Sequence, residues 1–212
     1  MSRIMRAKAV VGLCLFGLWL AGANSPATAD SIVCVEEDWK LVVRDPHKDT
    51  GSPQVTTQMK RATYVERVCM SLLNFNDLPS YRAGGVQTQV WKGKDNLSYA
   101  TYAGEPLALS IPDETITWTQ RLRLSNGQLL YGLSAASSQT WGDFSGMEIV
   151  SHGSYPDLSD YTPSYSVDNS GITFGANRVS GLEITAIRYT YSNGSVKTDS
   201  TRRVVYPRPS PP

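Results

Sequence analysis

Apolar and polar side chains alternate with a period of two along most of the chain after residue 30, where Thr, Val, Tyr and Ile are abundant. Alternation of this kind is typical of strands with one buried face, and no segment there carries the 3.6-residue period of an amphipathic helix. Turn-forming residues interrupt the pattern about every ten residues. The sequence therefore predicts an all-β fold of antiparallel strands joined by turns.

The clearest predicted unit is a hairpin at residues 115–135. One face of its first strand carries the apolar side chains Ile116, Trp118, Leu122 and Leu124, and the other face carries threonine and arginine. Asn126 and Gly127 follow, and this pair favours a two-residue type I′ turn because both positions need positive φ.

A second hairpin is predicted at residues 182–206, with its turn at Asn193-Gly194. Further strands are predicted at residues 39–44, 54–60, 64–75, 86–92, 97–102, 147–150 and 172–174. Residues 155–171 are rich in Ser, Tyr, Asp and Pro and are predicted to form an irregular surface loop. About ten strands in one domain favour a two-sheet antiparallel sandwich of the jelly-roll or concanavalin A-like kind.

The N-terminal segment departs from this pattern. Three basic residues precede an apolar run at residues 9–23, and the segment ends in Ala27-Thr28-Ala29. The run is too short to span a bilayer, and small residues at these positions are what a signal peptidase accepts. We therefore expect residues 1–29 to be a cleavable signal peptide, which predicts a secreted protein, extracellular or periplasmic, without membrane insertion.

Cleavage would leave one domain at residues 30–206 and a proline-rich, disordered tail at residues 207–212. The leader holds three of the 20 basic residues and none of the 19 acidic ones, so 17 basic residues remain and the net charge becomes −2. A slightly acidic domain has no electrostatic reason to bind nucleic acid.

Two cysteines, Cys34 and Cys69, remain after the leader. In an oxidising compartment we expect them to form a disulfide, which stabilises a fold by about 3–4 kcal/mol in the chain-entropy model. Two buried free thiols are the alternative.

No catalytic signature is complete. Asp49-Thr50-Gly51 matches the local pattern of an aspartic protease, but no apolar strand precedes it and the second carboxylate is missing. Glu36 and Asp38 alternate like the acids of jelly-roll glucanases, but Leu41 stands where the third acid belongs. A solvated acidic run near the new N-terminus explains these residues more simply, so we expect no enzyme.

No resident cofactor is predicted either. Structural calcium remains open, because hard oxygen ligands are present in two acidic loops, although their spacing matches no defined calcium loop. These loops contain Asp45 and Asp49, and Asp157, Asp160 and Asp168.

Loop aromatics are the remaining candidates for binding. Trp141 and Asp143 lie where the first hairpin ends, and Tyr161 and Tyr165 lie in the long loop. Aromatic rings offer flat faces for stacking on sugars, and neighbouring polar groups can anchor the hydroxyls. We take Trp141 and Asp143 as the first-choice contacts, followed by Tyr161 and Tyr165.

Several segments resemble a group of uncharacterised secreted bacterial proteins. They are Trp39-Lys40-Leu41-Val42-Val43, Asp45-Pro46, Ser52-Pro53-Gln54-Val55-Thr56-Thr57, Thr140-Trp141-Gly142-Asp143-Phe144 and Asn169-Ser170-Gly171-Ile172-Thr173-Phe174-Gly175-Ala176-Asn177-Arg178-Val179. The size and strand pattern are also similar to those of concanavalin A-like sandwiches. That likeness rests on architecture and carries over no functional residue.

The sequence thus predicts an exported, non-catalytic β-sandwich that binds extracellular glycan, either polysaccharide or envelope glycan. Two alternatives remain. One is a glycan-acting hydrolase with Glu36 and Asp38 as its acids, and the other is a cell-surface or matrix protein whose partner is another protein.

Overall fold

The computed structural model describes residues 30–44, 55–61, 68–73, 85–103, 111–140, 142–151, 154–165 and 179–207. The predicted leader, the predicted strand at residues 172–174 and the tail beyond residue 207 lie outside these ranges. Every regular element in the described ranges is a strand. A search of the same residues found no helix with the length and apolar character needed to cross a membrane.

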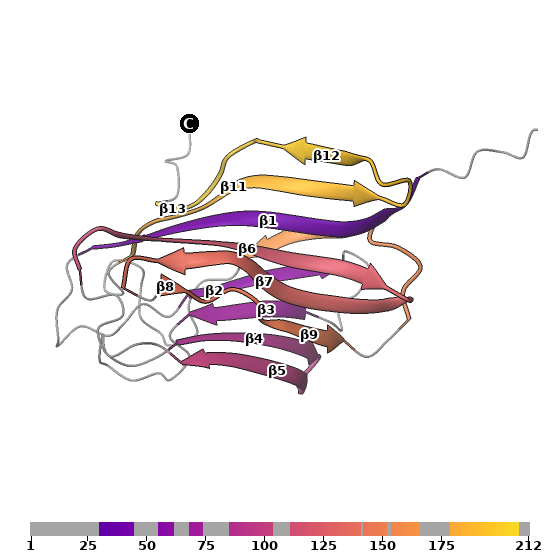
Figure 1. Ribbon diagram of the computed structural model, residues 1–212, viewed down its shortest axis with the longest axis horizontal. Coiled ribbons are helices and arrows are strands. Elements are labelled where there is room, and N and C mark those ends of the chain that lie inside the picture. Colours follow the sequence, from indigo (N-terminus) through magenta and orange to yellow (C-terminus); the bar gives the residue numbers. More distant parts are fainter. Residues whose placement is uncertain are drawn as a thin grey trace, which may run out of the picture.

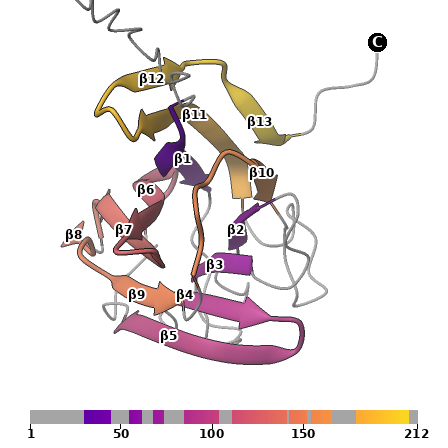
Figure 2. The same ribbon diagram turned by 90° about the vertical axis from the view of Figure 1, so that its right-hand side faces the viewer.

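The strands form two antiparallel sheets (Figures 1 and 2). The first sheet has the order β12 (Val196–Asp199), β11 (Val179–Tyr191), β1 (Ile32–Val43), β6 (Glu114–Ser125), β7 (Gln128–Ser138) and β8 (Gly142–Asp143). In addition, β13 (Arg203–Tyr206) pairs with β11, and β9 (Glu148–Ser151) pairs with β7. The second sheet has the order β10 (Tyr161–Tyr165), β2 (Val55–Arg61), β3 (Val68–Leu73), β4 (Gly85–Lys92) and β5 (Asp95–Ala103).

The two sheets face each other across one apolar core in a sandwich-like arrangement. The second sheet contributes Val55, Met59, Val86 and Val90 to the same buried cluster as the central strands of the first sheet. Strand β1 lies between β6 and β11, and its odd-numbered residues from Val35 to Val43 point into this core. The all-β, antiparallel prediction is therefore confirmed.

The predicted hairpin at residues 115–135 is confirmed as β6 and β7. Asn126 and Gly127 have φ values of 51° and 74°, as a type I′ turn requires, and Ser125 pairs with Gln128. Ile116, Trp118 and Leu122 are buried, and Leu124 is partly buried against the core.

The second predicted hairpin is present but differs in detail. Only Gly194 of its turn has positive φ (84°), and its amide donates to the carbonyl of Tyr191 (2.9 Å). The return strand is divided into β12 and β13, because the Asp199 carboxylate accepts the amide hydrogen of Thr201 (2.9 Å) and turns the chain between them.

Two other predictions need correction. Strand β1 begins at Ile32, seven residues before the predicted start at residue 39. The segment at residues 155–171 is not wholly irregular, because β10 pairs with β2 along the edge of the second sheet. In β10, Pro163 cannot donate to a ladder, and an edge position tolerates this.

Candidate functional site

A buried carboxyl lies between the two sheets. Glu37 of β1 points into the core and has no solvent exposure. Three groups donate hydrogen bonds to its carboxylate: the indole nitrogen of Trp39 (2.9 Å), the amide nitrogen of Gln120 and the hydroxyl of Tyr161. A buried charge needs such partners, because the apolar interior cannot solvate it.

Gln120 is oriented by contacts on its other side. Its side-chain oxygen accepts hydrogen bonds from the hydroxyls of Thr57 (2.8 Å) and Tyr131 (3.3 Å), so its nitrogen faces Glu37. Thr57 belongs to β2 and Tyr161 to β10, whereas Glu37 and Gln120 belong to the first sheet. We call Glu37, Gln120, Tyr161, Thr57 and Tyr131 the inter-sheet cluster, since its hydrogen bonds join the two layers.

Burial raises the pKa of Glu37 to about 7, although the hydrogen bonds from Tyr161, Gln120 and Trp39 work in the opposite direction. Burial and the nearby Glu37 carboxylate raise the pKa of Tyr161 well above its usual range, so its hydroxyl keeps its proton. Gln120 is also fully buried. The cluster therefore connects the two sheets through hydrogen bonds and contains a titratable carboxyl.

A groove lies beside this cluster, at the end of β11 and along β12. It has a volume of about 430 Å³. Its lining residues are Ile32, Tyr189, Tyr191, Lys197, Thr198, Asp199 and Ser200. We call this feature the β11–β12 groove.

The strand register explains the composition of the groove. Tyr189 stands opposite Lys197, and Ile187 stands opposite Asp199, so both charged residues of β12 lie across from apolar or aromatic residues of β11. Ile32 of β1 pairs with Tyr191 on the other side. Residues from the first and last parts of the domain therefore share one wall.

The polar groups of the groove are held in place. Asp199 accepts hydrogen bonds from the Thr201 amide and from the Arg203 guanidinium (2.5 Å). Contacts with Thr201 and then with Arg203 hold the pKa of Asp199 well below its usual range, so it is a fixed acceptor. The ring of Tyr189 packs edge-on against Tyr161, with centroids 6.2 Å apart, and connects the groove to the inter-sheet cluster.

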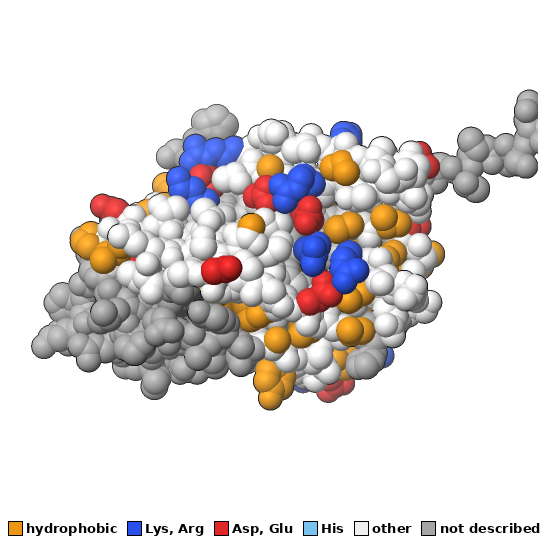
Figure 3. All heavy atoms as spheres, in the orientation of Figure 1, with side chains coloured by type: hydrophobic (Ala, Val, Ile, Leu, Met, Phe, Trp, Pro, Cys, Tyr) orange, Lys and Arg blue, Asp and Glu red, His pale blue; other side chains and the backbone are white. Residues whose placement is uncertain are grey.

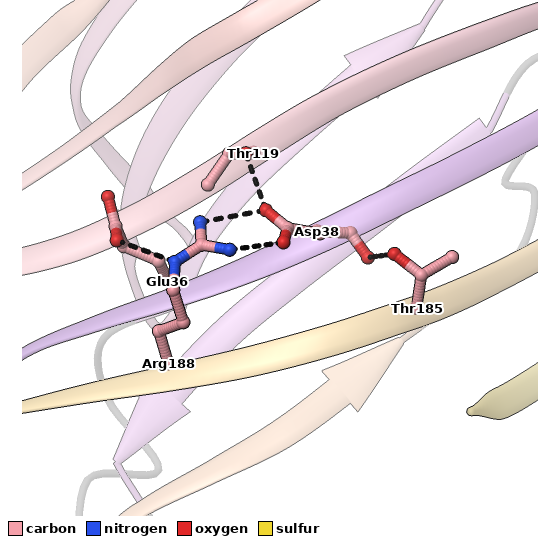
Figure 4. Close-up of polar contacts among 5 residues, drawn as sticks. All are labelled: Glu36, Asp38, Thr119, Thr185 and Arg188. Carbon is pink, nitrogen blue, oxygen red and sulfur yellow. Dashed lines mark hydrogen bonds and ion pairs between the residues drawn. The ribbon is translucent and has the colours of Figure 1, made fainter. Parts of the chain in front are cut away.

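The even-numbered residues of β1 point to the outer face of the first sheet. There the guanidinium of Arg188 lies between Glu36 and Asp38 (Figure 4). Its Nε contacts Glu36 at 3.1 Å, and two of its nitrogens contact the two oxygens of Asp38. Burial raises the pKa of Asp38, but hydrogen bonds from Arg188 and Thr119 outweigh it and leave the pKa below its ordinary value.

The acidic run at residues 36–38 is thus divided between two environments. Glu36 and Asp38 share one face, as the alternation predicts, but both are paired with Arg188. Glu37 is buried, so the interpretation of the whole run as solvated is wrong. Both acids, Glu36 and Asp38, are therefore ion-paired with the same guanidinium on the outer face.

A second group of charges lies on the same face, where basic and acidic side chains sit next to one another (Figure 3). Glu148 of β9 accepts hydrogen bonds from Arg121 (3.0 Å) and from Arg123 (2.8 and 3.1 Å). These pairs hold β9 against the central hairpin, in line with the pairing of Gly132 with Glu148.

Cys34 lies on this outer face and is a free thiol in the structure. Burial, and then the charge of Glu36, raise the pKa of its thiol to about 11, so little thiolate forms near neutral pH. The side chain of Cys69 lies outside the described residues. The disulfide between the two cysteines stays a prediction.

Two of the four predicted ligand contacts can be placed in the structure, and two cannot. Trp141 lies outside the described residues, as does the side chain of Tyr165. Asp143 of β8 is exposed, and its carboxylate accepts the Ser145 amide hydrogen (2.8 Å). Strand β8 and strand β10, which carries Tyr161, lie on opposite sides of the molecule in Figure 2.

Other predictions fall partly outside the described ranges. Asp45, Asp49 and Asp168 are not described, and Asp157 accepts the Ser159 amide hydrogen (2.9 Å). The described residues contain no group of three His, Cys, Asp or Glu side chains that could hold a metal ion. The calcium prediction therefore stays untested, because most of the predicted ligands lie outside the described residues.

Sequence reasoning missed Glu37, Gln120 and the groove. A signal for the first two was present, because Glu37 is in phase with Trp39 and Leu41, and Gln120 is in phase with Trp118. A polar residue in the buried phase of a strand indicates an internal hydrogen-bonded group. Tyr189 and Lys197 gave no comparable signal, because their proximity depends on the register of two strands.

Comparisons with known proteins give no family. No family profile matches the sequence, and a search of curated proteins found no match. Among solved structures, the crystal structure of scytalido-glutamic peptidase with a transition state analog inhibitor is similar over 82% of this chain and 78% of that chain. Its sequence identity is 9% and its TM-score is 0.34, so we base no conclusion about fold or function on it.

Proposed function

We propose that this protein is an exported, non-catalytic β-sandwich that binds extracellular glycan in the β11–β12 groove. The observation that carries the proposal is the composition of this groove, which combines two tyrosine rings with a lysine, an aspartate and two hydroxyl side chains. Its volume of about 430 Å³ falls within the range of small-ligand sites, roughly 300–1,000 Å³.

The chemistry of the lining suits a sugar. A pyranose ring presents C–H groups on its faces and hydroxyls at its edge, and Tyr189 and Tyr191 offer aromatic surface for the former. Lys197 supplies a donor for the hydroxyls, and Asp199, kept ionised by Thr201 and Arg203, supplies an acceptor. Both kinds of contact are needed, because stacking provides area and hydrogen bonds provide orientation.

The proposal includes the export and finer fold predicted from the sequence. The signal peptide at residues 1–29 and the jelly-roll, concanavalin A-like order are part of this proposal. The first fits the resemblance to secreted bacterial proteins, and the second rests on the size and strand pattern of the domain. Intact-mass measurement of protein recovered from outside the cytoplasm tests the first, with Asp30 as the expected N-terminal residue.

A glycan array tests the binding proposal, with the wild type, Tyr191→Ala and Tyr99→Ala compared on identical slides. Tyr99 is an exposed tyrosine of β5, outside the groove, so its removal controls for loss of an aromatic surface residue. We expect binding by the wild type and by Tyr99→Ala, with at least a tenfold loss in Tyr191→Ala. Absence of wild-type binding to any glycan would favour a protein partner, and unchanged binding by Tyr191→Ala would exclude this groove.

A further inference from the structure

The β11–β12 groove shares a wall with the inter-sheet cluster. Tyr189 lines the groove on one side and packs edge-on against Tyr161 on the other. The hydroxyl of Tyr161 in turn donates its hydrogen to the buried carboxylate of Glu37. A continuous chain of contacts therefore runs from Glu37 through two tyrosine rings to the surface.

Charged groups near Glu37 reach the same groove. Arg203 of β13 attracts the Glu37 carboxylate and also binds Asp199, which lines the groove. Tyr191 and Lys197 are further titratable side chains of the groove lining. Tyr161 of β10 and Tyr189 of β11 interact with Glu37 itself. Both keep their protons near neutral pH, because burial raises the pKa of each phenol.

The remaining neighbours of Glu37 are neutral. Gln120 of β6 and Trp39 of β1 can only donate toward Glu37, because the Gln120 oxygen already accepts from Thr57 and Tyr131. Tyr161 is the partner that can reverse its role, since a hydroxyl both donates and accepts. Protonation of Glu37 would thus act first on Tyr161.

We infer that proton uptake by Glu37 changes the wall of the β11–β12 groove through Tyr161 and Tyr189, which makes the groove a pH-responsive element. When Glu37 is ionised, Tyr161 donates to it and Arg203 is drawn toward the cluster. When Glu37 is neutral, its own hydrogen can be donated to the Tyr161 oxygen, and Arg203 keeps its contacts with Asp199 and the Thr201 carbonyl. Tyr189 contacts Tyr161 directly, so its ring environment differs between the two states.

The test uses the protein alone and needs no glycan, so its outcome is independent of the proposed binding activity. Ring resonances of ¹³C-labelled tyrosines are followed by NMR between pH 5 and 9, with Tyr189 assigned from its substitution by phenylalanine. The indole signal of Trp39 reports on Glu37 directly, because this nitrogen donates to the carboxylate. We expect both signals to shift in one step with a common midpoint near pH 7.

Two variants locate the origin of that step. Glu37→Gln removes the titrating carboxyl but keeps both histidines of the chain. A pH step in the Tyr189 signal that comes from Glu37 therefore vanishes in this variant, whereas a step caused by a histidine remains. In Tyr161→Phe, we expect the Trp39 signal to titrate still, while the Tyr189 ring no longer responds. The Tyr161→Phe result alone is decisive if Glu37→Gln does not fold, which near-UV circular dichroism would reveal.

Three results would overturn the inference: a Tyr189 ring signal that does not shift with pH in the wild type, a Tyr189 step that persists in Glu37→Gln, or a Tyr189 step that survives in Tyr161→Phe. The exposed Tyr99 ring is the internal reference, and we expect no step for it near pH 7.

Discussion

The hydroxyl of Tyr161 donates a hydrogen bond to the carboxylate of Glu37 and so joins an edge strand of the second sheet to a central strand of the first. The two residues are far apart in the sequence. Glu37 is fully buried and Tyr161 is partly buried, and a buried polar group needs a hydrogen-bond partner. This contact therefore affects both the stability of the sandwich and its dependence on pH.

Stability should decrease as pH rises toward neutrality. The folded-state pKa of Glu37, about 7, lies above the ordinary value of 4.5, so the folded protein binds more protons than the unfolded chain between these values. The resulting stabilisation is fully present below pH 4.5 and is lost as pH rises through 7. At about 1.4 kcal/mol per pKa unit, it amounts to about 3 kcal/mol.

Urea unfolding of the wild type and of Glu37→Gln at pH 5, 6, 7 and 8 measures this effect. We expect the difference in unfolding free energy between the two proteins to change steadily across the series and to favour Glu37→Gln increasingly at high pH. A constant difference at all four values would show that Glu37 does not titrate in this range.

Tyr161→Phe removes one donor from Glu37 and leaves the ring in place. Loss of a hydrogen bond to a buried charge costs about 1–3 kcal/mol, and the loss should be greater at pH 8, where Glu37 is ionised, than at pH 5. Tyr99→Phe is the matched control, since its ring is 65% exposed and should give no measurable change. Equal destabilisation at both pH values would argue against a role for the ionised carboxylate.

Gly132→Ala should destabilise the protein more than Gly181→Ala. A Cβ atom at residue 132 would lie 2.4 Å from the carbonyl oxygen of Met147, so the backbone between β7 and β9 must move. At residue 181 the nearest atom is a methyl of Val42 at 3.8 Å, which is an ordinary contact. We expect Gly132→Ala to lower the free energy of unfolding by about 1–3 kcal/mol and Gly181→Ala to change it little, as measured by thermal unfolding.

Arg188→Met tests the ion pairs of the outer face. The substitution keeps much of the apolar stem but leaves Glu36 and Asp38 without their shared cation. We expect a loss of about 1 kcal/mol at low salt and a smaller loss at 1 M salt, because these side chains are partly exposed. Lys94→Met, at an exposed position in the turn after β4, is the control. An equal salt effect in Lys94→Met would show that the salt-dependent loss in Arg188→Met does not come from its ion pairs.

Local patterns predicted much of the fold because apolar and polar side chains alternate every two residues in a strand with one buried face. The position and turn type of the β6–β7 hairpin are predictable from the sequence, because Asn126 and Gly127 both readily adopt the positive φ that a type I′ turn requires. Strand β1 was predicted too short, because the acidic residues at its start hid an alternation in which Glu37 occupies a core position. Strand β10 was missed because its sequence resembles a loop and it depends on β2 for its partner.

The candidate site was much less predictable than the fold. Trp141 and Asp143 were selected as loop residues of suitable chemistry, yet a binding surface depends on which strands become neighbours. Tyr191 and Ile32 form adjacent parts of the groove only because β1 and β11 pair along their whole length. Local sequence carries no information about such a long-range pairing, whereas it does carry information about turns.

The pairing of Ile32 with Tyr191 has a consequence for biogenesis. Strand β1 cannot complete its pairing during synthesis until β11, which lies far later in the sequence, has been made. Folding that depends on such distant contacts is slow and begins late. A chain that ends before β11 therefore has no β11–β12 groove.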